Sequence, residues 1–209
     1  MRTHRSNAPL SLVVGARSRD GDLARGLIAG EAWAVAETWQ RFAPMVLMTA
    51  ERSLGSRAEA DDIVQEVFCR VFRKARTLRD PDSLRSFIYS FAIRVLKAEL
   101  RRRKVRGWFP FLPAAAPAEV LFSASDFESR DLLAKLYALL DRLTPRDRLV
   151  FVLRRMESMT VDEIAATMDI SVSTVKRSMV HASSRMSRWV EADPGLAGLA
   201  RGEHWGRRR

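Results

Sequence analysis

The stretch from Thr160 to Arg188 constrains the fold more than any other part of the chain. Thr160 and Glu163 have the spacing of a capping box, in which each side chain satisfies a backbone N–H at the start of a helix. Asp169 stands where a turn is expected, because aspartate tolerates the left-handed backbone region better than most residues. Ser171 can then cap a second helix. The pattern predicts two helices joined by a tight turn.

The second of these helices has two chemically different faces. Its apolar residues recur in steps of three and four, the spacing of one buried helix face, and they are Val172, Val175, Met179, Ala182 and Met186. The other face carries short polar or cationic groups that suit the major groove of DNA, namely Thr174, Lys176, Arg177, Ser178, His181 and Arg185. This indicates a DNA-reading helix-turn-helix, and the alternative is an ordinary helical hairpin with a solvated basic face.

The whole chain is strongly basic. Its 209 residues carry 36 lysines and arginines against 25 aspartates and glutamates, a formal net charge of +11. Such a balance points to a polyanionic partner, either nucleic acid or an acidic membrane surface. Hydrophobic residues make up 47% of the chain, which is enough to bury the cores of one or two domains.

Cysteine and histidine usage argues against a metal site or a disulfide framework. Cys69 is the only cysteine, and His4, His181 and His204 are widely scattered. We therefore expect no metal and no other cofactor, and a reducing cytoplasm fits the composition.

No part of the chain has the hydropathy of a membrane span. No apolar run approaches the roughly 18 residues that a spanning helix needs. The run Leu10 to Ala16 follows two arginines, as in a signal peptide, but it is short and charged residues follow it at once. We expect no membrane insertion and a cytoplasmic location.

The N-terminal half is predicted to be a helical domain that covers residues 21–106, preceded by a mobile basic arm at residues 1–20. Within it, the helix Ala58 to Arg76 gathers polar groups at its N-terminal end, namely Asp61, Asp62, Gln65 and Glu66. Its C-terminal end is basic, with Arg70, Arg73, Lys74 and Arg76. This order complements the helix dipole, which would explain it fully. A binding surface for a partner is the alternative.

The following helix, from about Asp82 to Arg103, ends in a one-sided charge run. From Lys97 to Arg106 there are six basic residues against the single acid Glu99, which predicts a track for phosphate groups. Phe87 and Phe91 could stack on unpaired bases. Their spacing places them on the apolar face, however, and we expect core packing instead.

Residues 107–127 are predicted to be a proline-rich linker, because Pro110, Pro113 and Pro117 exclude a regular helix throughout. A linker of this length can extend to at most about 65 Å. Residues 128–190 read as a second helical domain of four helices, and residues 191–209 as a flexible tail. The expected fold is therefore all-α, with two small helical domains.

With both halves in view, the chain resembles a bacterial RNA polymerase sigma factor of the extracytoplasmic-function (ECF) type, within the sigma-70 family. The segments AEADDIVQEVFCRVFRKA (Ala58 to Ala75) and SLRSFIYSFAIRVLKAELRRRK (Ser83 to Lys104) are similar to the family's region 2. The segment LLDRLTPRDRLVFVLRRMESMTVDEIAATMDISVSTVKRSMVHA (Leu139 to Ala182) is similar to its region 4. The resemblance runs from about Asp22 to Val190.

This resemblance implies a role for each group of residues. The region 2 helix would dock on core RNA polymerase through Asp61, Asp62, Gln65 and Glu66. The −10 promoter element would be captured and opened by Arg79, Ser83, Arg94, Lys97 and Arg101. The −35 element would be read as duplex by Ser171, Ser173, Thr174, Lys176, Arg177, Val180 and His181. The family often has an anti-sigma factor as a further partner, and binding to polymerase would place the protein on the nucleoid.

The sequence departs from the family pattern at several positions. Asp169 and Ser173 stand where glycines are usual, and Ile93 with Arg94 stands where the family often has Arg-Asn. Ala98 replaces an acid, while Val180 and His181 replace an aromatic residue and an arginine. These changes bear on which promoter is recognised and leave the class of activity intact.

Two other functions are the alternatives to this interpretation. A one-component helix-turn-helix regulator would use the same DNA-reading helix without polymerase and would not need the acidic cluster around Asp62. An enzyme would need a catalytic triad, a carboxylate pair, a glycine-rich phosphate loop or a metal-ligand set, and the sequence has none of these. We therefore expect no catalysis and no small-molecule substrate.

Overall fold

The computed structural model describes residues 10–106, 127–193 and 196, and in these residues it contains helices and no strand. The all-α prediction is therefore confirmed. Two short 3₁₀ turns, Ala75–Thr77 and Pro81–Ser83, separate the third and fourth helices. The α-helices are α1 (Leu10–Ala29), α2 (Ala32–Leu54), α3 (Arg57–Lys74), α4 (Leu84–Arg106), α5 (Phe127–Asp141), α6 (Pro145–Arg155), α7 (Val161–Met168) and α8 (Val172–Ala192).

Capping residues set most of the helix boundaries. Ser56 caps α3 by accepting a hydrogen bond from the backbone N–H of Glu59 at 3.4 Å. Thr144 caps α6 in the same way, with proline at the first helical position. Gly55 ends α2 with φ of +73°, a left-handed conformation that glycine adopts without steric cost. Local chemistry therefore decides where these helices begin and end.

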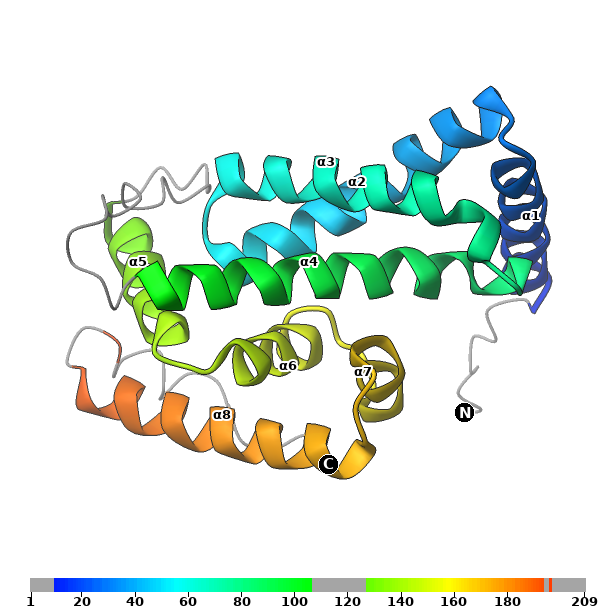
Figure 1. The fold of residues 1–209 in the computed structure, drawn as a ribbon. Coiled ribbons are helices and arrows are strands. Elements are labelled where there is room, and N and C mark those ends of the chain that lie inside the picture. The colour runs from blue at the N-terminus through cyan, green and yellow to red at the C-terminus, as the bar shows by residue number, and fades with distance from the viewer. Residues whose placement is uncertain (1–9, 107–126, 194–195, 197–209) are drawn as a thin grey trace, which may run out of the picture.

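The N-terminal half is a bundle in which α2, α3 and α4 pack against one another and α1 closes one end (Figure 1). The fully buried side chains include Val46 of α2, Phe68 of α3, and Leu84 and Leu96 of α4. In the C-terminal half, α6 and α7 pack on α8, and α5 contacts the end of α8. A second apolar cluster there joins α5, α6 and α8 through residues such as Leu140, Phe151 and Met186.

The two halves share one hydrophobic core. Leu149 and Leu153 of α6 and Ile164 of α7 are fully buried and belong to the same cluster as the core of α2, α3 and α4. The sequence predicted two domains but gave no sign of how they pack. Figure 1 shows the result, with α3 and α8 along opposite edges of the molecule and α4 and α6 between them.

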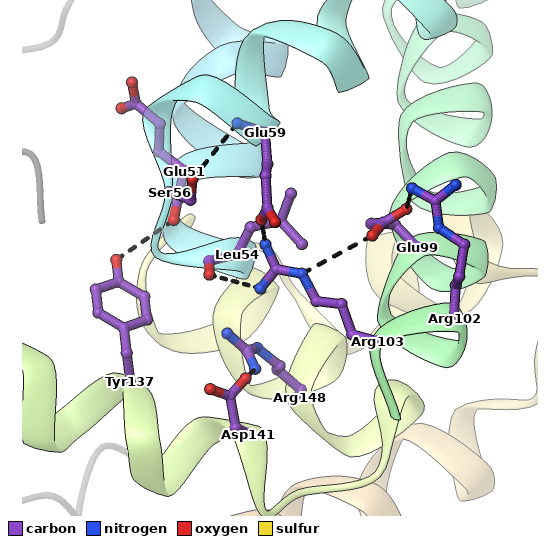
Figure 2. Close-up of polar contacts among 10 residues, drawn as sticks. All are labelled: Glu51, Leu54, Ser56, Glu59, Glu99, Arg102, Arg103, Tyr137, Asp141 and Arg148. Atoms are coloured by element: carbon purple, nitrogen blue, oxygen red, sulfur yellow. Dashed lines mark hydrogen bonds and ion pairs between the residues drawn. The ribbon is translucent and has the colours of Figure 1, made fainter. Parts of the chain in front are cut away.

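Polar contacts fix the seam between the halves. Arg52 of α2 donates hydrogen bonds to the backbone oxygen of Met156 at 2.7 Å and to a carboxylate oxygen of Glu157 at 2.9 Å. The hydroxyl of Tyr137 on α5 donates to the backbone oxygen of Glu51 at 3.4 Å (Figure 2). These contacts hold the end of α2 against both α5 and the loop after α6.

Two of the predicted boundaries differ from the structure. Helix α1 begins at Leu10, so residues 10–20 are helical and not a mobile arm. The helix is anchored further along by buried Leu23 and Leu27, and adding residues to an existing helix is far easier than nucleating one. At the other end α8 continues to Ala192 and Leu196 is buried, so the start of the predicted flexible tail is ordered.

The remaining parts of these terminal segments, residues 1–9, 194–195 and 197–209, lie outside the described residues, as does nearly all of the predicted linker 107–127. Only Phe127, where α5 begins, belongs to both the predicted linker and a described helix.

The contact of Tyr137 with Gly55 can be tested with a matched pair of glycines. Both Gly55 and Gly30 have positive φ, but a methyl group at Gly55 would meet the Tyr137 ring at 2.7 Å, whereas nothing lies within 4 Å at Gly30. Gly30→Ala should lower the free energy of unfolding by about 1–2 kcal/mol, the cost of a left-handed alanine. Gly55→Ala should cost at least about 1 kcal/mol more because the ring must move. Urea unfolding of both variants measures this, and equal losses would contradict the packing described.

Candidate nucleic-acid interface

The polar cluster on α3 lies on the face of that helix that points away from the core. Asp61, Asp62 and Gln65 are exposed, and Glu66 is half-buried. Two of the four have ion-pair partners one turn away on the same helix. Arg57 lies 3.6 Å from Asp61, and Arg70 lies 2.6 Å from Glu66. The opposite face carries Val67 and Phe68 into the core, which fixes the outward orientation of the cluster.

Helix α4 presents a mixed aromatic and cationic stripe. Phe87, Phe91, Arg94, Ala98 and Arg101 follow one another in steps of three and four, so they share one side of the helix. The rings of Phe87 and Phe91 meet edge to face at 5.0 Å, and the Arg94 guanidinium lies 5.3 Å from the Phe91 ring centre. Both phenylalanines pack against the core while remaining half-buried. The expected core packing is therefore found, with an edge of each ring left near the surface.

The other residues predicted to contact the −10 element differ in their exposure and in the hydrogen bonds they already make. Arg79 is exposed in the loop between the two 3₁₀ turns, and Lys97 is half-buried on α4. The hydroxyl of Ser83 donates to the backbone oxygen of Asp80 at 2.7 Å. This bond stabilises the turn before α4. Because the hydroxyl hydrogen is already used, the Ser83 oxygen can only accept a hydrogen bond from a ligand.

Two cations of the basic run at the end of α4 bond to other parts of the molecule, which reduces what this run can offer to phosphate groups. Arg103 donates to the backbone oxygen of Leu54 at 2.9 Å and pairs with Glu59, and Arg102 pairs with Glu99 (Figure 2). Lys104 donates to the backbone oxygen of Leu143 at 3.3 Å, across the seam between the halves. Within this run Lys97 and Arg101 are the predicted DNA contacts. The bonds of Arg103 to Leu54 and Glu59 and of Lys104 to Leu143 join segments too distant in sequence to predict, whereas Arg102 and Glu99 are only three residues apart on one helix.

The helix-turn-helix forms as predicted. The N–H of Thr160 donates to the Glu163 carboxylate at 2.7 Å, and the N–H of Glu163 donates to the Thr160 hydroxyl at 3.2 Å. The backbone hydrogen bond from Thr160 lowers the pKa of Glu163. Asp169 ends α7 with φ of +53°, and Ser171 caps α8 by accepting from the N–H of Thr174 at 3.2 Å. Aspartate in place of glycine is thus compatible with the turn.

One face of α8 is buried and the other is open to solvent. Val175, Ala182 and Met186 are fully buried. Of the predicted DNA-reading residues, only Thr174 is half-buried. The others are exposed, namely Ser171, Ser173, Lys176, Arg177, Val180 and His181. Val180 is 71% exposed, which is unusual for a valine. Ser171 differs from the others because its oxygen already serves as the helix cap.

A buried carboxylate behind α8 was missed by the sequence reasoning. Asp147, in the first turn of α6, is only 4% exposed, and its Oδ2 lies 2.8 Å from Nδ1 of His181. Burial alone would raise the pKa of Asp147, but hydrogen bonds from His181, Ser178 and Thr144 outweigh it and lower the pKa below the ordinary value. The carboxylate is therefore ionised at neutral pH. Its 34-residue separation from His181 left no local signal of this contact.

Neither a metal-ligand cluster nor a membrane-spanning helix is found in the described part of the chain. No group of three or more histidine, cysteine, aspartate or glutamate side chains there could hold a metal ion. None of the helices described is both long and apolar enough to cross a bilayer.

Comparison with known proteins gives matches in both halves. The family model for sigma-70 region 2 matches residues 38–106, and the model for sigma-70 region 4 matches residues 133–186. The ferric citrate uptake sigma factor FecI of Escherichia coli K12 is 34% identical over 129 residues, which cover 60% of this chain and 73% of FecI. The ECF RNA polymerase sigma factor SigE of Mycolicibacterium smegmatis is 30% identical over 156 residues, which cover 73% of this chain and 59% of SigE.

Solved structures share the fold. CnrH, in complex with the cytosolic domain of CnrY, superposes with a TM-score of 0.59 at 24% identity, covering 83% of this chain and 98% of that one. The sigma factor RpoE of Bartonella quintana, in complex with the anti-sigma factor NepR, gives a TM-score of 0.58 at 14% identity, covering 76% of this chain and 97% of that one.

The lowered pKa of Asp147 predicts a pH-dependent contribution to stability. A carboxyl whose folded pKa is depressed stabilises the fold above its unfolded pKa of about 3.9, and this contribution is lost as pH falls through the folded pKa. Asp147→Asn should therefore lower the free energy of unfolding by about 1–3 kcal/mol at pH 7. The difference from the wild type should shrink below about pH 4. Denaturant unfolding at several pH values measures it, with exposed Asp131→Asn as the control. A difference that stays constant with pH would show that Asp147 acts through packing alone.

Proposed function

The chain belongs to the extracytoplasmic-function group of the sigma-70 family, and we propose that three separate faces carry out its work as a sigma factor. Members of this family bind core RNA polymerase and direct initiation at specific promoters, and they are not enzymes. The observation that carries the proposal is the arrangement of these faces. The acidic face of α3 and the polar face of α8 lie on opposite edges of one packed body, with α4 between them (Figure 1).

The exposed face of α3 is proposed as the docking site for core polymerase. Asp61, Asp62, Gln65 and Glu66 supply negative charge and an amide on a helix whose other side is locked into the core. Asp62 and Gln65 are the most direct candidates for contact, since Asp61 and Glu66 already pair with arginines of their own helix. Electrostatic complementarity of this kind mainly raises the rate and specificity of association.

The α4 stripe and the loop before it are proposed to capture the −10 element. Arg79, Arg94 and Arg101 are exposed cations that can bind phosphates. Lys97 can add a weaker contact from its half-buried position, whereas Ser83 acts chiefly through the shape of its turn. The half-buried rings of Phe87 and Phe91 beside Arg94 add an aromatic surface next to this cationic track.

The exposed face of α8 is proposed to read the −35 element as duplex DNA. Lys176, Arg177, Val180 and His181 point to solvent from the first three turns of the helix, which is where a recognition helix contacts base edges. The hydroxyls of Ser173 and Thr174 lie within 3.0 and 2.8 Å of the capping hydroxyl of Ser171. This cluster surrounds a helix N-terminus, where a DNA phosphate binds favourably.

The division of labour follows the two halves of the chain. We propose that residues 21–106 form the unit that binds polymerase and the −10 element, and that residues 128–190 form the unit that binds the −35 element. A protein partner that covers one of these faces is also expected, because the solved RpoE structure includes an anti-sigma factor. The cytoplasm is the expected location, since polymerase and promoters are found there.

Reconstituted transcription tests the proposal as a whole. The purified protein, added to core polymerase with a library of promoter fragments, should give transcripts that start downstream of shared −10 and −35 sequences. Tight sequence-specific binding to duplex DNA with no effect on polymerase would instead support the one-component regulator and overturn the proposal.

The α3 face can be tested separately by charge reversal. Asp62→Lys should weaken binding to core polymerase about tenfold or more, a change of about 1.4 kcal/mol, because it places a cation in an acidic docking site. Glu37→Lys is the matched control, since Glu37 is an exposed acid on α2 of the same half. Competition binding against a labelled sigma factor measures both variants. Equal affinity of Asp62→Lys and Glu37→Lys would exclude this face as the docking site.

A further inference from the structure

The contact between His181 and Asp147 joins the DNA-facing side of α8 to the interior of the C-terminal half. The side chain of His181 is 48% exposed, whereas that of Asp147 is 5% exposed. Nδ1 of the ring lies 2.8 Å from the Asp147 carboxylate. One edge of the imidazole is therefore fixed from behind, and the other edge remains at the surface of the helix.

This contact settles which ring nitrogen can face a ligand. An ionised carboxylate accepts hydrogen bonds and cannot donate them, so Nδ1 must carry the hydrogen in the contact with Asp147. The second nitrogen, Nε2, is then the atom left for a partner outside the protein. A surface histidine without such a neighbour would exchange tautomers and rotate freely.

The carboxylate is itself held rigidly. Asp147 receives hydrogen bonds from Ser178 and Thr144 as well as from His181, and its own N–H donates to the Thr144 hydroxyl at 3.1 Å. Ser178 is buried on α8. The same carboxylate thus links the capped start of α6 to the middle of α8. Because the carboxylate is held in place, its hydrogen bond also fixes the orientation of the His181 ring.

The direction of the ring places it among the predicted DNA contacts. Thr174, Arg177 and His181 follow in steps of three and four, so they share one side of α8. Val180 beside them is 71% exposed. The Nε2 edge of His181 therefore belongs to the surface proposed to meet duplex DNA.

We propose that Asp147 is a positioning residue for promoter recognition, which holds His181 so that Nε2 forms a hydrogen bond with the DNA of the −35 element. This inference rests on the proposed function of α8. The bond partner is either a base edge or a phosphate oxygen, and the two differ in how they respond to sequence. A phosphate contact contributes equally on all sequences, whereas a base contact discriminates at one position.

Two substitutions of His181 distinguish the roles of its two ring nitrogens. The amide of asparagine reaches about as far as Nδ1, and the amide of glutamine reaches about as far as Nε2. His181→Asn should keep the contact with Asp147 and lose roughly tenfold in affinity for the −35 element, the size of one specific contact. His181→Gln should keep most of the affinity. Denaturant unfolding of both variants checks that the fold is retained, because His181→Gln removes one hydrogen bond to the buried Asp147 carboxylate.

The role of Asp147 is tested by a double-mutant cycle with the same residues. Asp147→Asn should weaken promoter binding several-fold in the wild type and should have no further effect when His181 is glutamine, because that side chain does not depend on the carboxylate. If Asp147 has only a structural role, Asp147→Asn should weaken promoter binding equally with histidine or glutamine at position 181. This result would overturn the proposal. Nitrogen-15 NMR of the His181 ring adds a direct readout, with the Nδ1–H form expected in the wild type and lost in Asp147→Asn.

Promoter binding is measured with the full chain bound to core polymerase, on promoters in which each −35 base pair is varied in turn. A loss confined to one base pair in His181→Asn assigns the contact to a base edge, and a uniform loss with a shallower salt dependence assigns it to a phosphate. Core binding should be the same for all variants, and Asp131→Asn on α5 serves as the control acid. If the wild type itself gives no promoter-specific transcripts, the proposed function fails. If the wild type transcribes and both His181 variants match it, only this inference fails.

Discussion

Burial of α6 and α7 against α4 is the interaction on which the rest of the structure depends. Leu149, Leu153 and Ile164 are fully enclosed in a core that also contains Leu84 and Leu96 of the other half. Each such side chain contributes roughly 1.5–3 kcal/mol when it is removed from water. The three buried side chains together contribute more than the two hydrogen bonds of Arg52 along the seam, because each hydrogen bond of a charged group contributes about 1.5–3 kcal/mol. The polar contacts select the register in which the halves meet, and the apolar core supplies the free energy.

This packing decides which charges remain for binding. A chain with net charge +11 could have exposed cations everywhere, but several of them close the structure instead. Arg103 bonds to the end of α2, Arg52 bonds across the seam, and Lys104 bonds to the end of the loop before α6. Arg94 and Arg101 on α4 and Lys176 and Arg177 on α8 lie outside this network and are exposed. The internal use of these basic residues leaves the exposed cations of α4 and α8, with Arg79 in the loop before α4, for the proposed DNA contacts.

The sequence predicted those features that depend on neighbouring residues. The capping box at Thr160 and the left-handed turn at Asp169 both appear where the pattern placed them, because their chemistry lies within one or two helical turns. The contacts that join distant segments were not predictable. His181 meets Asp147 across 34 residues, and Arg52 meets Glu157 across 105. Helix α1 was placed too late for a related reason, since its anchoring leucines lie towards its C-terminal end and its first residues show no apolar period of their own.

The residues of the surface proposed to read the −35 element lie on α8, but the orientation of one of them depends on α6. Lys176 and Arg177 are flexible cations whose positions follow from the helix alone. His181 is different, because the ring orientation is set by a carboxylate that a comparison of recognition helices would overlook. Replacing the arginine that is usual in the family by histidine shortens the side chain, and a shorter side chain reaches DNA only if it is held in one direction. In the proposed mode of recognition His181 and Asp147 act together, and promoter preference would depend on both α6 and α8.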